Sequence, residues 1–276
     1  MKKDFPPRLH VILARESSLG VVFRRGPSKS VCTFLWDRKD DSFSLGQWMR
    51  GRIYERRADL SPDGKYLIYF AMNGRWDSET KGAWTAISRA PYLKAITLLA
   101  KGDCWHGGGL FTKKKEFWLN DGYGHAPLQV STEIHRDFAF RPDTYYGGEC
   151  PGVYYVRLVR DGWRWVTRED KGHWHDADVF EKSLRGGWTL RKFAHGEVNA
   201  APGHGVYWDE HSLFHAESGL VIDGSKWEWA EVDKNRLVWA SGGQIHAGYL
   251  RSRKLCDTRV LHDFNDMKFE AIEAPY

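Results

Sequence analysis

The sequence predicts an all-β protein, and three observations lead to that prediction. The first is a turn, Ser61-Pro62-Asp63-Gly64, set between two short hydrophobic stretches. The second is a series of short strand-like segments separated by turns rich in Gly, Pro and Asp. The third is that no stretch of about 12 residues shows the 3.6-residue period of an amphipathic helix. Many short strands with turn signals between them are typical of a sandwich, a barrel or a propeller.

The turn is predicted from the chemistry of its residues. Pro62 restricts φ at the second turn position, Asp63 can hydrogen-bond back to the chain, and Gly64 can adopt a positive φ without a Cβ clash. The run "YLIYF" at 66–70 follows at once. It is too short for a helix and apolar on both faces, so we expect a hairpin whose second strand is covered on both sides.

The remaining strands are predicted from short runs of β-branched and aromatic residues between turn signals. They are expected at 9–14, 20–24, 31–36, 66–71, 83–88, 95–100, 152–159, 188–193, 236–240 and 245–250.

The stretch "DLSPDGKYLIYFA", within residues 57–71, resembles the repeat of TolB-type and WD40-like β-propellers, in which such a turn links two strands of a blade. Weaker echoes stand at 139–148 and 232–240. The resemblance implies one β-propeller domain over residues 1–276. Closure of such a ring would pair the N-terminal strand at 9–14 with a C-terminal strand near 259–264. Propellers serve many unrelated functions, so the resemblance implies none.

The number of blades is estimated from the spacing of tryptophans. Trp-Asp pairs begin at Trp36, Trp76 and Trp208, and further tryptophans lie near the intermediate positions. A period of about 43 residues would match the length of one blade. We therefore expect about six four-stranded blades, with five or seven as the alternatives.

Charge and cysteines limit the function classes. The net charge is +5, and Lys and Arg outnumber Asp and Glu mainly in residues 1–58, which predicts one basic face suited to an acidic protein partner or to nucleic acid. No RNA-binding signature accompanies it, so nucleic acid is not the expected partner. The four cysteines lie far apart, as in a cytoplasmic protein with reduced thiols. No apolar run is long enough for a signal peptide or a membrane span.

Binding residues are predicted where aromatic side chains meet glycines. In "CWHGGGLF" the candidates are Trp105, His106, Gly107 and Gly108, because consecutive glycines allow the backbone to approach a ligand or another strand closely. In "DGWRWV" the candidates are Trp163 and Trp165 as aromatic platforms. Most of the fourteen tryptophans are expected to pack between blades instead.

The stretch "GHWHDADVF" has the densest set of metal-ligating residue types. His173 and His175 would share one face of a strand, and Asp176 or Asp178 could complete a site. Because three ligands in six residues rarely close a site without a distant fourth, we expect a polar loop that contributes to binding, no metal, and no cofactor.

The sequence therefore predicts a non-catalytic adaptor that presents a loop surface to a partner protein. The alternative is a carbohydrate-active or lactonase-like hydrolase with acids or a metal in a central channel, for which Asp103, Asp121, Glu149, Asp176 and Asp223 stand beside glycines or aromatic residues. A third reading is nucleic-acid binding through the basic N-terminal blade. No catalytic residue is predicted, because no nucleophile motif such as G-x-S-x-G occurs.

Overall fold

The computed structural model describes residues 5–26, 29–122, 124–168, 177–201, 204–251 and 253–276. The chain divides into two compact units. The larger unit consists of Val11–Asp161 and Lys268–Tyr276, and the smaller unit of Met1–His10 and Gly162–Met267. The expectation of a single domain over residues 1–276 stays a prediction.

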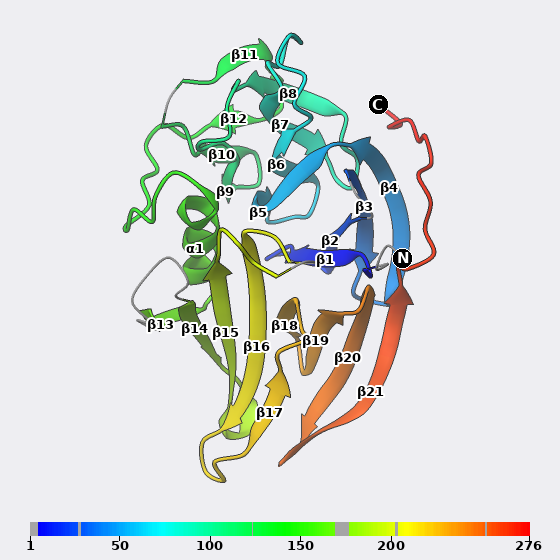
Figure 1. The fold of residues 1–276 in the computed structure, drawn as a ribbon, viewed down its shortest axis with the longest axis vertical. Coiled ribbons are helices and arrows are strands. Elements are labelled where there is room, and N and C mark those ends of the chain that lie inside the picture. Colours follow the sequence, from blue (N-terminus) through cyan, green and yellow to red (C-terminus); the bar gives the residue numbers. More distant parts are fainter. Residues whose placement is uncertain (1–4, 27–28, 123, 169–176, 202–203, 252) are drawn as a thin grey trace. The chain divides into compact units, whose positions relative to one another are not determined.

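The larger unit contains three sheets and the one α-helix of the described residues (Figure 1). The first sheet has the order β1-β2-β3-β4, the second β11-β8-β7-β6-β5 and the third β12-β10-β9. The elements are β1 (Arg8–Leu13, whose first residues belong to the smaller unit), β2 (Leu19–Arg25), β3 (Ser30–Asp37), β4 (Ser42–Arg50), β5 (Arg52–Leu60), β6 (Tyr66–Met72), β7 (Ala83–Arg89), β8 (Ala95–Ala100), β9 (Gly109–Lys113), β10 (Glu116–Leu119), β11 (Ala126–Gln129), β12 (His135–Arg136) and α1 (Cys150–Arg160).

The smaller unit contains two sheets, in the orders β13-β14-β15-β16-β17 and β18-β19-β20-β21. Its elements are β13 (Arg164–Arg168), β14 (Asp178–Ser183), the 3-10 turn η1 (Arg185–Gly187), β15 (Trp188–Gly196), β16 (Tyr207–His215), β17 (Val221–Gly224), β18 (Trp229–Asp233), β19 (Arg236–Ser241), β20 (Gln244–Arg251) and β21 (Lys254–Asp263).

The predicted all-β class is confirmed, and the sheets are consistent with a propeller. Within the sheets, neighbouring strands mostly follow one another in the chain and pair antiparallel. The exceptions are β11, which pairs antiparallel with β8, and β12, which forms a short parallel pairing with β10. Such meandering sheets of about four strands are the unit of a propeller. The described strands form five sheets, so the predicted count of six blades is not confirmed.

The tryptophan spacing does not mark equivalent positions. Trp36 lies in β3, the third strand of its sheet, Trp118 lies in β10, and Trp208 lies in β16 next to the edge of a five-stranded sheet. Trp76 lies outside any strand and is 56% exposed. A repeat of blades would place corresponding residues in corresponding strands, so this spacing is not a blade period.

The predicted pairing of residues 9–14 with 259–264 does not occur among the described strands. β1 neighbours β2, and β21 pairs with β20, so the two segments belong to different sheets. Short turns bring strands that are adjacent in the chain together first, and these local pairings already satisfy one side of each terminal strand.

The hairpin of β5 and β6 has the predicted turn. The backbone N–H of Gly64 donates to the Ser61 carbonyl over 2.8 Å, and Gly64 has a φ of +79°. The Ser61 hydroxyl donates to the Asp63 carboxylate and accepts the Tyr66 N–H. The turn and the positive φ of Gly64 were expected from the Ser-Pro-Asp-Gly sequence, because only glycine adopts this φ without strain. The contacts of the Ser61 hydroxyl were not predicted.

Replacing Gly64 by valine is expected to lower the free energy of unfolding by about 1–3 kcal/mol, because a β-branched residue is strained at positive φ. A Cβ at this position would also lie 2.8 Å from the Cβ of Leu19. The thermal midpoint of the variant, measured by circular dichroism, should fall below that of the wild type. An unchanged midpoint would show that this turn contributes nothing to stability.

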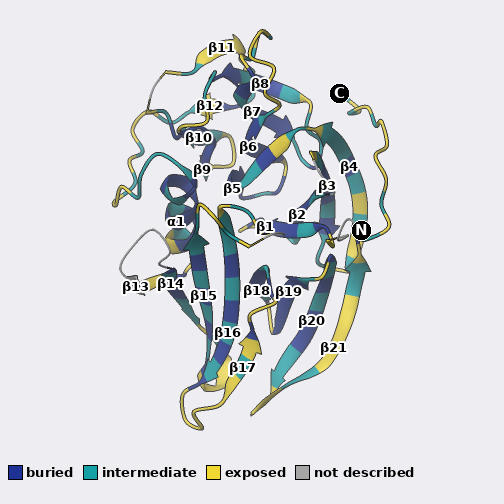
Figure 2. Ribbon diagram, viewed as in Figure 1, coloured by how far each residue is buried: buried dark blue, intermediate teal, exposed yellow. Residues whose placement is uncertain are grey.

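β6 is covered on both faces, as its sequence predicts. Leu67, Tyr69 and Ala71 pack in one hydrophobic cluster, together with residues of β2 and β5. Tyr66 and Ile68 pack in a second cluster on the other face, together with residues of β8, β9 and β10. Figure 2 shows β6 buried almost throughout, whereas the edge strand β11 is exposed.

The predicted strand at 152–159 is wrong, because these residues form the helix α1. The run Val153-Tyr154-Tyr155 resembles a strand locally, but buried residues recur at the spacing of a helix, at Val153, Arg157 and Leu158 among others. An arginine in the buried stripe conceals that period. Arg157 is buried because its guanidinium donates to the Ala58 carbonyl of β5, a long-range contact that the local pattern does not show.

No helix in the described part of the chain is both long and apolar enough to cross a membrane.

Candidate binding pocket

A cavity of about 640 Å³ lies in the larger unit, beside the end of β10 and the first turn of α1. Its walls come from the loop that follows β10, from β12, and from the loop at 137–147. The lining residues include His106, Asp121, Gly122, Arg136, Asp137, Phe138, Arg141 and Tyr145. A cavity of this size is typical of sites that hold a small molecule or a side chain of a partner.

A chain of hydrogen bonds lies beneath the pocket. The backbone N–H of Gly108 donates to the Thr85 hydroxyl over 2.9 Å, and that hydroxyl lies 3.0 Å from Nε2 of His125. Nδ1 of His125 lies 2.9 Å from Oδ1 of Asp121, and Arg136 donates to the other carboxylate oxygen over 3.1 Å. These hydrogen bonds therefore connect four segments: the glycine turn at Gly108, β7, the loop that follows β10, and the strand β12.

The protonation states of His125 and Asp121 follow from their burial and from their hydrogen bonds. Burial lowers the pKa of His125, although the Asp121 carboxylate acts in the opposite direction. Burial alone would raise the pKa of Asp121, but hydrogen bonds and charge from His125 and Arg136 outweigh it and hold the pKa below its ordinary value. A neutral imidazole then donates from Nδ1 to Asp121 and accepts the Thr85 hydroxyl proton at Nε2.

Thr85 is not placed to act as a nucleophile. Its side chain is fully buried, and its oxygen already accepts the Gly108 N–H. A catalytic hydroxyl must reach a substrate, whereas this one joins the backbone of Gly108 to the buried ring of His125. The Asp121, His125 and Thr85 arrangement therefore supports the pocket wall.

His106 forms one wall of the pocket, packed between two glycines. A Cβ on Gly122 would lie 2.1 Å from Nε2 of His106, and a Cβ on Gly148 would lie 2.4 Å from the same atom. Only glycine at both positions leaves room for the ring. Burial lowers the pKa of His106, and the positive charges of Lys101 and Arg57 lower it further. The imidazole is therefore neutral near pH 7.

The rim carries exposed aromatic side chains beside arginines. Phe138 is 70% exposed and Tyr145 is 78% exposed. The guanidinium of Arg136 lies 4.8 Å from the centre of the Phe138 ring. Arg141 donates to the carbonyls of Phe138 and Phe140, which holds the loop in its curved path. Exposed aromatic rings and arginines are the residue types that protein interfaces favour.

The acids at the pocket are engaged in structural hydrogen bonds. Both oxygens of Asp121 are taken by His125 and Arg136, as described above. One oxygen of Asp137 accepts the backbone N–H groups of Ala139 at 2.9 Å and Phe140 at 3.0 Å. These contacts shape the rim loop, and neither carboxylate has the environment of a general acid, whose pKa must be raised.

Of the four predicted binding residues of the larger unit, only His106 lines the pocket. His106 lines it, as stated, whereas Trp105 is 55% exposed and is not among the lining residues. Gly107 and Gly108 lie behind His106, with φ of +85° and +73°. A Cβ on Gly108 would lie 1.9 Å from the Arg57 carbonyl oxygen, so these glycines allow a close approach of two backbones.

The predicted residues of the smaller unit differ from one another in burial. Trp163 is 2% exposed, and its indole N–H donates to Glu231 over 2.9 Å, so it is a core residue. Trp165 is 44% exposed in β13 and remains a candidate aromatic platform. His173 and His175 lie outside the described residues. Within the described ranges, no group of three His, Cys, Asp or Glu side chains could hold a metal ion.

The rim residues Phe138, Arg141 and Tyr145 were not predicted from the sequence. The stretch "AFRPDTYYGG" resembles a degenerate turn, and its turn residues conceal the function of the aromatic ones. Aromatic side chains in a loop without an apolar period are a signal that could have identified them, because such residues have no core of their own to fill.

No protein-family model matches this sequence. No curated protein matches it either. Among solved structures, Kuenenia stuttgartiensis hydrazine synthase is similar at 10% identity and a TM-score of 0.29, covering 90% of this chain and 78% of that chain. A B. megaterium levansucrase variant is similar at 11% identity and a TM-score of 0.32, covering 94% and 86%. Saccharomyces cerevisiae Sqt1 is similar at 9% identity and a TM-score of 0.29, covering 92% and 73%. Similarity at this level carries no argument about function.

Proposed function

We propose that this chain is a non-catalytic binding protein whose larger unit holds a segment of a partner protein in the pocket between β10, β12 and α1. The observation that carries the proposal is a contrast within the pocket. Its polar floor is already hydrogen-bonded internally through Asp121, whereas its rim exposes the rings of Phe138 and Tyr145 to solvent. A rigid floor with exposed aromatic rings is suited to binding without chemistry.

The rim also indicates the chemistry of the segment. Among the described residues, Arg141 has no carboxylate within salt-bridge distance, although its guanidinium lies on the pocket wall. A partner that places an apolar side chain against the two rings could place a carboxylate against Arg141. This arrangement supports the acidic protein partner expected from the charge of the chain.

The proposal is tested by selecting binders from a random peptide library displayed on phage, with the purified chain as the target. We expect enriched peptides that combine an aromatic or large aliphatic residue with Asp or Glu. Their affinity, measured by isothermal titration calorimetry, should fall at least about tenfold in the Phe138→Ala, Tyr145→Ala double variant, because buried aromatic anchors dominate such interfaces. Arg141→Gln should weaken acidic peptides specifically.

The matched control is Val130→Ala, since Val130 is 66% exposed and does not line the pocket. This control should bind the peptides as the wild type does. Equal affinity in the wild type and the double variant would contradict the proposal. Turnover of a glycoside or lactone that is lost in Asp121→Asn would favour the hydrolase alternative instead.

A further inference from the structure

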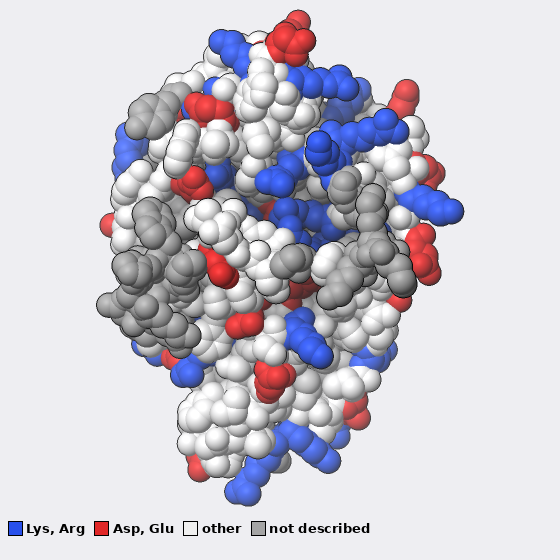
Figure 3. All heavy atoms as spheres, viewed as in Figure 1, with Lys and Arg blue, Asp and Glu red and all other residues white. Residues whose placement is uncertain are grey.

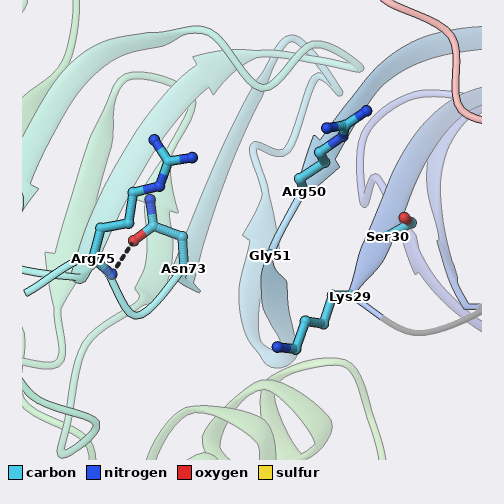
Figure 4. A pocket seen from close by; sticks show the side chains of 6 residues that line it. All are labelled: Lys29, Ser30, Arg50, Gly51, Asn73 and Arg75. Atoms are coloured by element: carbon cyan, nitrogen blue, oxygen red, sulfur yellow. Dashed lines mark hydrogen bonds between the residues drawn. The ribbon is translucent and has the colours of Figure 1, made fainter.

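A second cavity in the larger unit is lined by three cationic side chains. Its volume is about 540 Å³, and it is bordered by Lys29, Ser30, Arg50, Gly51, Asn73 and Arg75 (Figure 4). No residue of this set lines the pocket described above. We refer to these six residues as the basic cleft.

The pairing of the strands brings the cleft residues together. Ser30 at the start of β3 is paired with Arg50 at the end of β4, and Arg52 at the start of β5 is paired with Met72 at the end of β6. Gly51 is the single residue between β4 and β5, and its N–H donates to the Lys29 carbonyl over 2.8 Å. The turns at both sides of Gly51 therefore lie at the same end of neighbouring sheets.

Gly51 permits this close approach of the two sheets. A Cβ there would lie 2.9 Å from the Met72 carbonyl oxygen, a distance that side chains do not tolerate. With glycine, the strand passes directly from one sheet to the next. As a result, Arg50 lies opposite the turn that carries Asn73 and Arg75, as Figure 4 shows.

The cleft cations differ from other cations at this end of the unit in lacking acidic partners. Arg25 forms an ion pair with Glu55, and Lys101 forms one with Asp103 over 2.7 Å. Among the described residues, no carboxylate lies within salt-bridge distance of Lys29, Arg50 or Arg75, and none lines the cleft. Figure 3 shows Lys and Arg side chains gathered over the part of this face where β4, β5 and β6 lie in Figure 1.

The polar groups of the cleft present hydrogen-bond donors. Oδ1 of Asn73 accepts the backbone N–H of Arg75 over 2.9 Å, which leaves the amide NH₂ of Asn73 as the group that can face a ligand. The guanidinium groups of Arg50 and Arg75, the Lys29 ammonium and the Ser30 hydroxyl complete the set, and the Arg50 guanidinium also lies 4.8 Å from the centre of the Phe269 ring. A concave surface that is lined by positive charges and hydrogen-bond donors concentrates a positive electrostatic potential and therefore attracts anions.

We propose that the basic cleft binds a small molecule carrying two or more phosphoryl groups. Two arginines and a lysine favour a phosphoryl group over a carboxylate, because a phosphoryl group carries more negative charge and more acceptor oxygens, two of which one guanidinium can bond at once. The cleft is larger than a single inorganic phosphate requires and falls in the range of small-molecule sites. Its ligand is therefore an organic or inorganic oligophosphate.

The test is isothermal titration calorimetry on the purified full chain at about 50 mM salt, where screening is weak. The probes are sodium tripolyphosphate, ATP without divalent cation, and citrate as a carboxylate of comparable charge. We expect tripolyphosphate to bind at least about tenfold more tightly than citrate. ATP binding tighter than tripolyphosphate would identify a nucleotide as the ligand, and the reverse order would identify an inorganic polyphosphate.

Substitutions in the basic cleft test whether tripolyphosphate binds there. Arg75→Gln and the Arg50→Gln, Arg75→Gln pair should each weaken tripolyphosphate binding, by about tenfold for each side chain removed. The control pair is Lys65→Gln, Lys115→Gln, which removes the same charge from exposed turns at the other end of the strands and should bind as the wild type does. Circular dichroism confirms that each variant is folded.

The proposal is overturned if citrate binds as tightly as tripolyphosphate, or if the Arg50→Gln, Arg75→Gln pair and the control pair lose affinity equally. It is also overturned if a twelve-residue oligothymidylate binds through the cleft arginines while tripolyphosphate does not, since the cleft would then serve a nucleic acid. The peptide experiment on the pocket rimmed by Phe138 and Tyr145, here called the aromatic pocket, has an independent outcome, because the two sites share no lining residue.

Discussion

Replacing Asp59 by asparagine is expected to lower the free energy of unfolding by about 1.5–3 kcal/mol, because the guanidinium of Arg160 loses one of its two carboxylate partners and keeps only Asp161. Asp59 is fully buried in β5 and accepts hydrogen bonds from Nη1 of Arg160 at 2.6 Å and from Nη2 at 2.9 Å. It also accepts the backbone N–H of Phe111 over 2.8 Å. One carboxylate thus joins β5, β9 and α1.

Urea denaturation followed by circular dichroism measures this effect. Asp143→Asn is the matched control, since Asp143 is exposed and the same change there should stay within about 0.5 kcal/mol of the wild type. In the Asp59→Asn background, Arg160→Met should cost less stability than it does in the wild type, because the hydrogen bonds between Asp59 and Arg160 are already lost. If Asp59→Asn unfolds at the wild-type urea concentration, this ion pair does not hold α1 on the sheet.

Gly108→Ala is expected to cost about 3 kcal/mol or more, the sum of a left-handed backbone strain and a steric clash. Gly108 has a φ of +73°, and its Cβ would lie 1.9 Å from the carbonyl oxygen of Arg57. Because that oxygen belongs to the backbone of β5, no side-chain rotation can relieve the clash. The thermal midpoint should fall sharply, or the variant should fail to accumulate as folded protein.

Gly74→Ala separates the two contributions. Gly74 has the same φ of +73°, but no atom lies within 4 Å of the position that its Cβ would occupy. This control should therefore show the backbone strain alone, about 1–2 kcal/mol. The difference between the two variants measures the clash. Equal losses of stability would show that β9 and β5 can move apart without cost, contrary to the buried contact described.

The local elements of the fold could be predicted because they depend on neighbouring residues. The turn at Ser61–Gly64 is determined by proline and glycine, and the strand that follows it is determined by an apolar run. Both are observed, with Gly64 at positive φ and β6 covered on both faces. The helix α1 could not be predicted in this way, because its buried stripe contains Arg157, whose partner lies on β5.

The candidate sites depend more than the local turns and strands do on contacts between residues that are far apart in the chain. His106 was identified from a local sequence of aromatic residues and glycines, and it does line the aromatic pocket. The rings of Phe138 and Tyr145 come to the same pocket only because α1 and β10 place their loop there. In the basic cleft, Lys29, Arg50 and Arg75 are far apart in the chain and meet through strand register and the small size of Gly51.

The sequence by itself determined the all-β class, the positions of nine strands and the turn at Ser61–Gly64, since backbone preferences and the alternation of apolar residues act over a few residues. Only the tertiary structure decided the number of sheets, the helix, and which charges are paired. Whether an arginine is bound to a carboxylate, as Arg160 is to Asp59, or faces an open cleft, as Arg75 does, depends on residues brought together by folding. Charge acts through space, so its partners cannot be derived from adjacent positions in the chain.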